Sequence, residues 1–166
     1  MEKVGIFFGS STGNTEEIAK KLQSMLGNAE VFNAADTKPA KMAEFANIIL
    51  GTSTWGVGDL QDDMIEFAEG IAGVDLKGKV VALFGLGDQS GYGDTYCDGM
   101  GELYQKLQGK GCKIVGFVST QGYDFSASKA VEGGEFVGLA LDQMNQDDKT
   151  DERLNAWVAE LKKQFA

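Results

Sequence analysis

Short apolar runs alternate along this chain with segments of helical periodicity, and this alternation constrains the fold more than any other feature. The runs are rich in β-branched and aromatic residues and cover residues 3–8, 30–34, 47–52, 79–85 and 113–118. Between them, apolar residues recur at helical spacing, as at Ile18, Leu22 and Leu26. Such alternation is typical of a parallel sheet covered by helices on both faces. We therefore predict a three-layer α/β fold with a doubly wound sheet of five parallel strands.

A further apolar run, residues 137–142, follows the fifth run after a long polar segment. Loops of this length in compact domains are usually functional or structured. We interpret the two runs as halves of one fifth strand, split by an insertion over residues 119–136. A short hairpin at the sheet edge is the alternative. The sequence has no internal repeat and no linker, so we expect a single domain over residues 1–166.

Acidic residues outnumber basic ones, 25 against 15, which gives a formal net charge of −10. This charge repels nucleic acid and anionic membrane surfaces and suits basic protein partners. The apolar runs are far shorter than the roughly 20 residues that a membrane-spanning helix needs, and the first residues enter a strand without a signal-peptide pattern. We therefore expect a cytoplasmic protein that binds neither nucleic acid nor membrane.

The two cysteines, Cys97 and Cys112, do not form a recognisable motif. The chain has no CxxC pair and no histidine, so neither a metal-ligand set nor a Cys-His nucleophile can be assembled in the usual way. We expect both to be plain thiols and predict no metal site.

The first predicted strand leads into a turn of sequence GSSTGNT, residues 9–15, which is followed by a helical pattern. Hydroxyl groups and backbone N–H groups at a helix N-terminus can bind an anion. The turn carries no Lys or Arg, and Asn14 stands where a P-loop would have its lysine. The glycines do not match a Rossmann fingerprint either. One terminal phosphate remains, or else an ordinary helix cap made by Thr12 or Ser11.

Two more loops should leave the same edge of the sheet, where ligands bind in folds of this class. They are residues 52–63 and 85–99, and both are rich in glycine. They also carry Trp55, Tyr92 and Tyr96, which are large aromatic residues for loop positions. Either these aromatics anchor their own loops in the core, or they converge on a ligand. Three of them beside an anion-binding turn favour a flat ring system with one phosphate.

With these three loops in this order, the chain resembles the long-chain flavodoxins. Ser10, Thr12, Gly13 and Thr15 fit the T/S-x-T-G-x-T phosphate motif of that family. The resemblance continues through TSTWGVGDLQ, FGLGDQSGYGDTYCD, STQGYDFSASKAVEGGEFVGLALD and NQDDKTDERLNAWV, so it covers essentially the whole chain. It implies the strand order 2-1-3-4-5 and a non-covalently bound FMN.

The resemblance also implies which residues bind the cofactor. In the first loop they are Ser10, Ser11, Thr12, Gly13, Asn14 and Thr15, around the phosphate. In the second loop they are Ser53, Thr54, Trp55, Gly56, Val57 and Gly58. In the third loop they are Leu86, Gly87, Asp88, Tyr92, Thr95, Tyr96 and Cys97. The ring would lie between Trp55 and Tyr92, and the peptide at Gly56 would flip when the flavin is reduced. Met144 stands where relatives often have an acidic residue, and we assign it no role.

The function implied is a low-potential one-electron carrier, not an enzyme, that cycles between the semiquinone and the hydroquinone. The loops carry no basic residue, and their acidic residues disfavour an anionic reduced flavin. The expected partners are basic redox proteins such as a ferredoxin/flavodoxin-NADP reductase or a 2-oxoacid oxidoreductase, which a monomer would meet through an acidic collar. The collar comprises Asp59, Asp62, Asp63, Glu66, Glu69, Asp94 and Asp98.

The alternative functional classes are an enzyme and a non-redox module of the same fold. A flavodoxin-like NAD(P)H:quinone oxidoreductase needs an open flavin face, which two covering aromatics would deny. A receiver domain of the same fold needs an acidic pair after the first strand and an Asp ending the third. The chain has Gly9-Ser10 and Gly51-Thr52 there instead.

Overall fold

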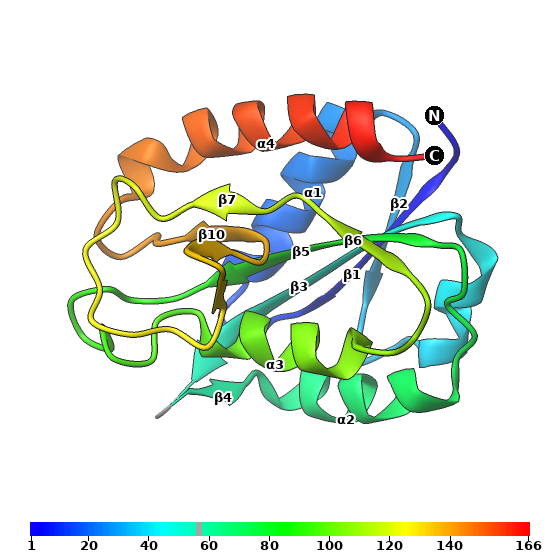
Figure 1. Ribbon diagram of the computed structural model, residues 1–166, viewed down its shortest axis with the longest axis horizontal. Coiled ribbons are helices and arrows are strands. Elements are labelled where there is room, and N and C mark those ends of the chain that lie inside the picture. The colour runs from blue at the N-terminus through cyan, green and yellow to red at the C-terminus, as the bar shows by residue number, and fades with distance from the viewer. Residues whose placement is uncertain (56–57) are drawn as a thin grey trace.

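The structure is a computed structural model that describes residues 1–55 and 58–166, and Trp55 by its backbone alone. Over these residues a parallel sheet forms the middle layer, with helices on both faces (Figure 1). In spatial order its strands are β2 (Ala29–Asn33), β1 (Val4–Gly9), β3 (Asn47–Trp55), β5 (Val80–Leu86) and β10 (Leu139–Leu141). This is the predicted order 2-1-3-4-5, so the fold prediction is confirmed.

The fifth strand is split, as predicted. β6 (Lys113–Val115) pairs with the first half of β5, where Val80 faces Lys113. β10 pairs with the second half of β5, where Leu139 faces Phe84. The chain between them makes a small antiparallel sheet of β7 (Val118–Ser119), β9 (Glu135–Phe136) and β8 (Val131–Glu132). The edge-hairpin alternative is therefore wrong, because both halves belong to the main sheet.

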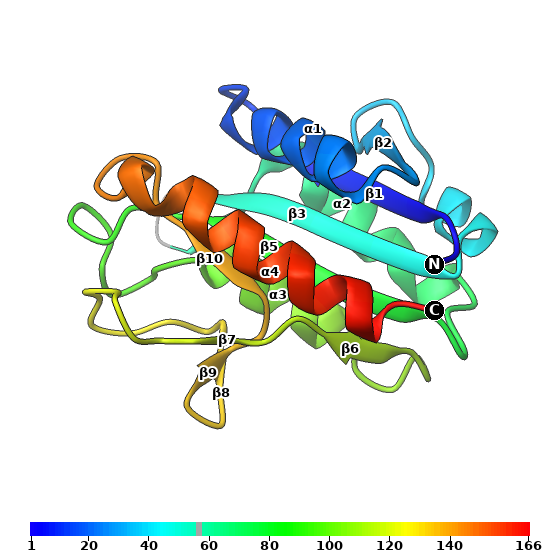
Figure 2. The ribbon, with the colours of Figure 1, turned by 90° about the horizontal axis from the view of Figure 1, so that it is seen from above.

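Helices α1 (Asn14–Leu26) and α4 (Thr150–Gln164) cover one face of the sheet, and α2 (Asp62–Gly70) and α3 (Asp98–Leu107) cover the other (Figure 2). The side chains of β1 explain how both faces are buried. Ile6 and Phe8 point to the α1 and α4 side, whereas Phe7 points to the α2 and α3 side, and each is at most 3% exposed. A strand buried on both faces must be apolar throughout, which is the pattern of its sequence.

Short connections complete the fold. The strand β4 (Asp59–Leu60) pairs antiparallel with the end of β3. The 3-10 helices are η1 (Pro39–Glu44), η2 (Ile71–Gly73) and η3 (Asp147–Lys149). The two termini lie side by side, and the N–H of Glu2 donates to the carbonyl of Ala166 (Figure 1). Among the described residues, no helix is both long and apolar enough to cross a membrane.

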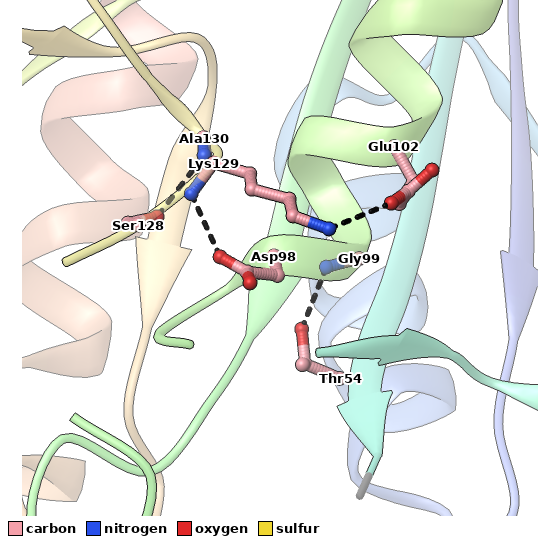
Figure 3. Close-up of polar contacts among 7 residues, drawn as sticks. All are labelled: Thr54, Asp98, Gly99, Glu102, Ser128, Lys129 and Ala130. Carbon is pink, nitrogen blue, oxygen red and sulfur yellow. Dashed lines mark hydrogen bonds and ion pairs between the residues drawn. The ribbon is translucent and has the colours of Figure 1, made fainter. Parts of the chain in front are cut away.

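The first turn of α3 is held between the end of β3 and the insertion (Figure 3). On one side, the N–H of Gly99 donates to Thr54 Oγ1 at 3.0 Å. On the other side, the N–H of Lys129 donates to Asp98 Oδ1 at 2.7 Å. Gly101 lets the insertion approach so closely, because a Cβ there would lie 2.6 Å from the carbonyl carbon of Lys129. The insertion is thus packed directly on the helix that begins beside the third loop.

We predict that Gly101→Ala destabilises the protein by about 1–3 kcal/mol, because the added methyl group would overpack this contact. Gly73→Ala is the matched control, since a Cβ at Gly73 meets nothing within 4 Å. Urea denaturation of both variants measures the difference. Equal midpoints for the two variants would contradict the close packing of the insertion on α3.

Candidate functional site

A cavity of about 270 Å³ opens at the carboxyl edge of the sheet. Pockets of roughly this size, lined by apolar groups and a few polar ones, are typical of small-molecule sites. The predicted site residues that line it are Thr12, Asn14, Ser53, Thr54, Leu86, Gly87, Asp88, Tyr92 and Thr95. The structure therefore brings the three predicted loops together around one cavity.

Two residues that the sequence analysis left out also line the cavity, Gln143 and Met144. They follow β10, whose carboxyl end lies at the same edge of the sheet as that of β5. Met144 is 74% exposed, which is unusual for a large apolar side chain. The signal available in the sequence was their position directly after the last strand-like run.

The first loop presents its backbone at the N-terminus of α1. The N-cap residue is Gly13, with a φ of 91°, and the helix has no side-chain cap. Positive φ is easily adopted by glycine alone. Ser10 Oγ accepts from the N–H of Gly13, whereas Ser11 Oγ accepts from Gln61 Nε2. The helix-cap alternative for Thr12 or Ser11 is therefore wrong, and the first N–H groups of α1 are left to bind an anion.

Gln61 joins the first two loops, and the sequence analysis missed it. Its side chain is 1% exposed and donates to Ser11 Oγ and to Asp63 Oδ2, each at 3.0 Å. Its Oε1 accepts from the N–H of Met64 and so caps α2. A Cβ on Gly9 would lie 2.2 Å from that Oε1, so a larger residue there would displace the Gln61 side chain. A lone glutamine in a polar loop gives no sequence signal for such a role.

The third loop is shaped by Asp88. Its Oδ1 accepts from the N–H groups of Ser90 and Gly91 and from Asn145 Nδ2. The Gly91 N–H and then the Asn145 amide hold the pKa of the Asp88 carboxyl below its ordinary value. Four residues on, the N–H of Tyr92 donates to the carbonyl of Asp88, and the Tyr92 ring stays 51% exposed at the cavity.

Thr95 has a buried hydroxyl group without a hydrogen-bond partner among the described residues. The residue that carries this Oγ1 lines the cavity. A buried hydroxyl without a partner is costly, and in native proteins it usually has an explanation. A ligand in the cavity that forms a hydrogen bond with this hydroxyl would explain it.

Tyr96 does not face the cavity, which corrects the expectation that three aromatics converge on the ligand. Its side chain is 0% exposed and lies against Tyr123, Phe125 and Phe136 of the insertion. Burying the large aromatic ring stabilises the fold. This gain outweighs the cost of a Tyr96 hydroxyl that has no hydrogen-bond partner among the described residues. The Tyr96 side chain therefore packs in the core and does not line the cavity.

Burial raises the pKa of the thiols of Cys97 and Cys112, which keeps both protonated.

One residue of the predicted acidic collar is buried. Asp98 is 3% exposed, since its carboxylate is enclosed between Gly58 and the backbone of Lys129. It therefore does not belong to an exposed collar. The other predicted members include the exposed Asp59, Asp62, Glu66, Glu69 and Asp94 and the partly exposed Asp63.

Some predicted site residues lie outside the cavity lining or outside the described residues. Ser10, Ser11, Gly13, Thr15, Gly58 and Cys97 lie in the predicted loops but not in the lining. The side chain of Trp55 and the residues Gly56 and Val57 lie outside the part that is described, so the proposed stacking and peptide flip stay predictions. Across residues 1–55 and 58–166, no group of three or more His, Cys, Asp or Glu is placed to hold a metal ion.

Comparison with known proteins agrees with this geometry. The family model for flavodoxin matches residues 6–157. The chain is 46% identical over 166 residues to a flavodoxin of Helicobacter pylori, covering 100% of both chains. It is 46% identical over 168 residues to a flavodoxin of a Picosynechococcus species, covering 99% of both. The crystal structure of Fusobacterium nucleatum flavodoxin bound to flavin mononucleotide superposes with a TM-score of 0.95 at 36% identity, covering 100% of both chains.

We predict that Asn145→Ala raises the pKa of Asp88 toward the ordinary value, since the mutation removes an amide donor to the carboxylate. A depressed pKa means that Asp88 stabilises the fold above its unfolded pKa of about 3.9 and loses this effect as pH falls through the lower folded value. Carboxyl-detected NMR titration of the apoprotein measures the midpoint. Gln105→Ala, an exposed amide deletion elsewhere, is the control. An unchanged Asp88 midpoint in Asn145→Ala would refute the contact.

Proposed function

Since this chain belongs to the flavodoxin family, we propose that it is an electron carrier that binds FMN non-covalently in the cavity at the carboxyl edge of the sheet. FMN exchanges electrons one at a time, and the protein's contribution is to bind it and set its potentials. The observation that carries the proposal is the meeting of an uncapped helix N-terminus, the Tyr92 ring and the unpartnered Thr95 hydroxyl around one cavity. The Fusobacterium relative with FMN supports it.

The residues present fit this cofactor. The first loop, residues 10–15, would hold the phosphate with hydroxyls and backbone N–H groups. Leu86, Gly87 and Asp88 would border the ring, with Tyr92 on one of its faces. The Thr95 hydroxyl would form a hydrogen bond with the bound cofactor. Gln143 and Met144 complete the lining of the cavity.

The charges of the loops support a low potential. Residues 9–15, 52–63 and 85–99 contain no Lys or Arg. The second and third loops carry several acidic residues, of which Asp88 lines the cavity. A fully reduced flavin that ionises would gain a negative charge without a cation nearby, which disfavours that state. We therefore propose that the carrier works between the semiquinone and the hydroquinone of FMN.

A carrier also needs partners, and the surface charge indicates their kind. We propose basic redox proteins, such as a ferredoxin/flavodoxin-NADP reductase or a 2-oxoacid oxidoreductase, as partners of a cytoplasmic monomer. The exposed carboxylates of the collar lie on β4, on α2 and in the third loop. They would attract a basic partner toward the cofactor edge.

Titration of the apoprotein with FMN and with riboflavin tests the binding proposal. We expect FMN to bind at least tenfold more tightly, because riboflavin lacks the phosphate that the first loop would hold. Quenching of flavin fluorescence reports binding. The carrier role is tested in parallel: NADPH alone should leave the holoprotein oxidised, and a flavodoxin reductase should reduce it. Equal affinities would refute the phosphate site, and rapid reduction by NADPH alone would indicate an enzyme.

Electron transfer from a basic reductase should slow as ionic strength rises, because salt screens exposed charges over about 8–10 Å. The double variant Asp62→Asn/Glu66→Gln should weaken this salt dependence. The double variant Glu152→Gln/Glu160→Gln removes the same charge from α4 and should leave the dependence as it is. Stopped-flow rates at a series of salt concentrations measure both. Rates that do not change with salt would remove the role of the collar.

A further inference from the structure

Asp142 is a buried carboxylate directly beside the cavity. It follows the last residue of β10 and is 0% exposed. The next two residues, Gln143 and Met144, line the cavity. None of the ion pairs among the described residues includes Asp142. Burial of a charge without a cationic partner is expensive unless hydrogen bonds compensate for the lost water.

Five N–H groups provide that compensation. Oδ2 accepts from the backbone N–H of Gln89 at 2.9 Å, from Gln89 Nε2 at 2.8 Å and from Asn145 Nδ2 at 2.9 Å. Oδ1 accepts from the N–H groups of Met144 at 3.1 Å and Asn145 at 2.9 Å. All five donors are neutral, so the negative charge is solvated by dipoles and is not cancelled. Both oxygens act only as acceptors, as an ionised carboxylate does.

These bonds connect three segments around the cavity. Gln89 belongs to the third loop, and its Oε1 accepts from the N–H of Asp124 in the insertion. Asn145 donates from the same Nδ2 to Asp142 and to Asp88, so one amide bridges the two carboxylates. Gln146 accepts from Gln89 and donates to the carbonyl of Gly122. Asp142 is thus the common acceptor that joins the third loop to the segment after β10, and Gln89 extends this network to the insertion.

The charge of Asp142 also acts on groups across the third loop. Burial is the main cause of the raised pKa of the Cys97 thiol, and the charge of Asp142 adds to it. Burial is also the main cause of the raised pKa of the Tyr96 phenol, and the charge of Asp142 makes a smaller contribution. A negative charge in this position disfavours the formation of another one nearby, since the interior screens it poorly.

We propose that Asp142 is a positioning residue that holds the third loop and residues 143–145 around the ring of bound FMN, and that its fixed negative charge lowers the potential of the final one-electron reduction. The inference rests on the proposed function, because it concerns FMN in this cavity. Asp142, which does not itself line the cavity, would thus have two separate effects. One is on the affinity for oxidised FMN, and the other is on the potential of the final reduction.

Asp142→Asn, in the holoprotein, tests both effects. The amide nitrogen that replaces one oxygen would face N–H donors, so oxidised FMN should bind more weakly by at least threefold. Loss of the charge should favour the final reduction by about three- to tenfold, which corresponds to about 30–60 mV upward. Asp148→Asn removes an equal charge from the exposed η3 and is the control, with no change expected. Anaerobic potentiometric titration and fluorescence titration give the two values.

A second variant keeps the test decisive if Asp142→Asn does not fold. Gln89→Ala removes a side-chain donor to Asp142 but keeps the charge, so it should weaken binding of oxidised FMN at least threefold and leave the potential unchanged. Unchanged affinity in Gln89→Ala would overturn the positioning role. A potential in Asp142→Asn equal to that in Asp148→Asn would overturn the charge effect. Failure of the wild-type protein to bind FMN would instead refute the proposed function itself.

Discussion

The site depends on the way in which β5 is paired. On one side β5 pairs along its whole length with β3, where Asn47 faces Val80 and Ser53 faces Leu86. On the other side two short strands share it, β6 beside its first half and β10 beside its second half. Because β10 is parallel and ends level with β5, the segment after β10 reaches the same sheet edge as the loops after β1, β3 and β5. The cavity is enclosed by these four segments.

Among the described residues that line the cavity there is no Lys or Arg, so an anionic cofactor would be bound there through dipoles. The described structure provides them at the N-terminus of α1, where Gly13 begins the helix without a side-chain cap. Carboxylates are handled in the same way. Asp88 and Asp142 both accept from backbone and amide N–H groups. An arrangement of this kind would suit the phosphate binding and the low potential that we propose, because dipoles can hold an anion while nearby carboxylates disfavour further negative charge.

The sequence predicted those parts that depend on periodicity and on local turns. Apolar runs such as residues 3–8 identified the strands, and the run 137–142 identified the second half of the split strand. The turn at residues 9–15 identified the first loop. The side-chain contacts over long sequence distances could not be predicted. Gln61 bonds to Ser11, fifty residues away, and Gln89 bonds to Asp142, fifty-three residues away.

Tyr96 shows why the remaining errors arose. Tyr92 and Tyr96 lie in the same loop and look equivalent in the sequence, but one stays exposed at the cavity and the other is buried under the insertion. The difference depends on Phe125 and Phe136, whose contact with Tyr96 no local pattern reveals. Asp98 was assigned to the surface for the same reason, since the chain that covers it comes from the insertion.

A crystal structure of the protein with FMN would show whether one cavity at this sheet edge holds the cofactor with its phosphate on the first loop. We expect the phosphate within hydrogen-bond distance of the N–H groups of residues 11–15, the ring beside Tyr92, and Thr95 Oγ1 bonded to the cofactor. A flavin bound elsewhere, or a phosphate that points into solvent away from the first loop, would show that this cavity is not the FMN site described above.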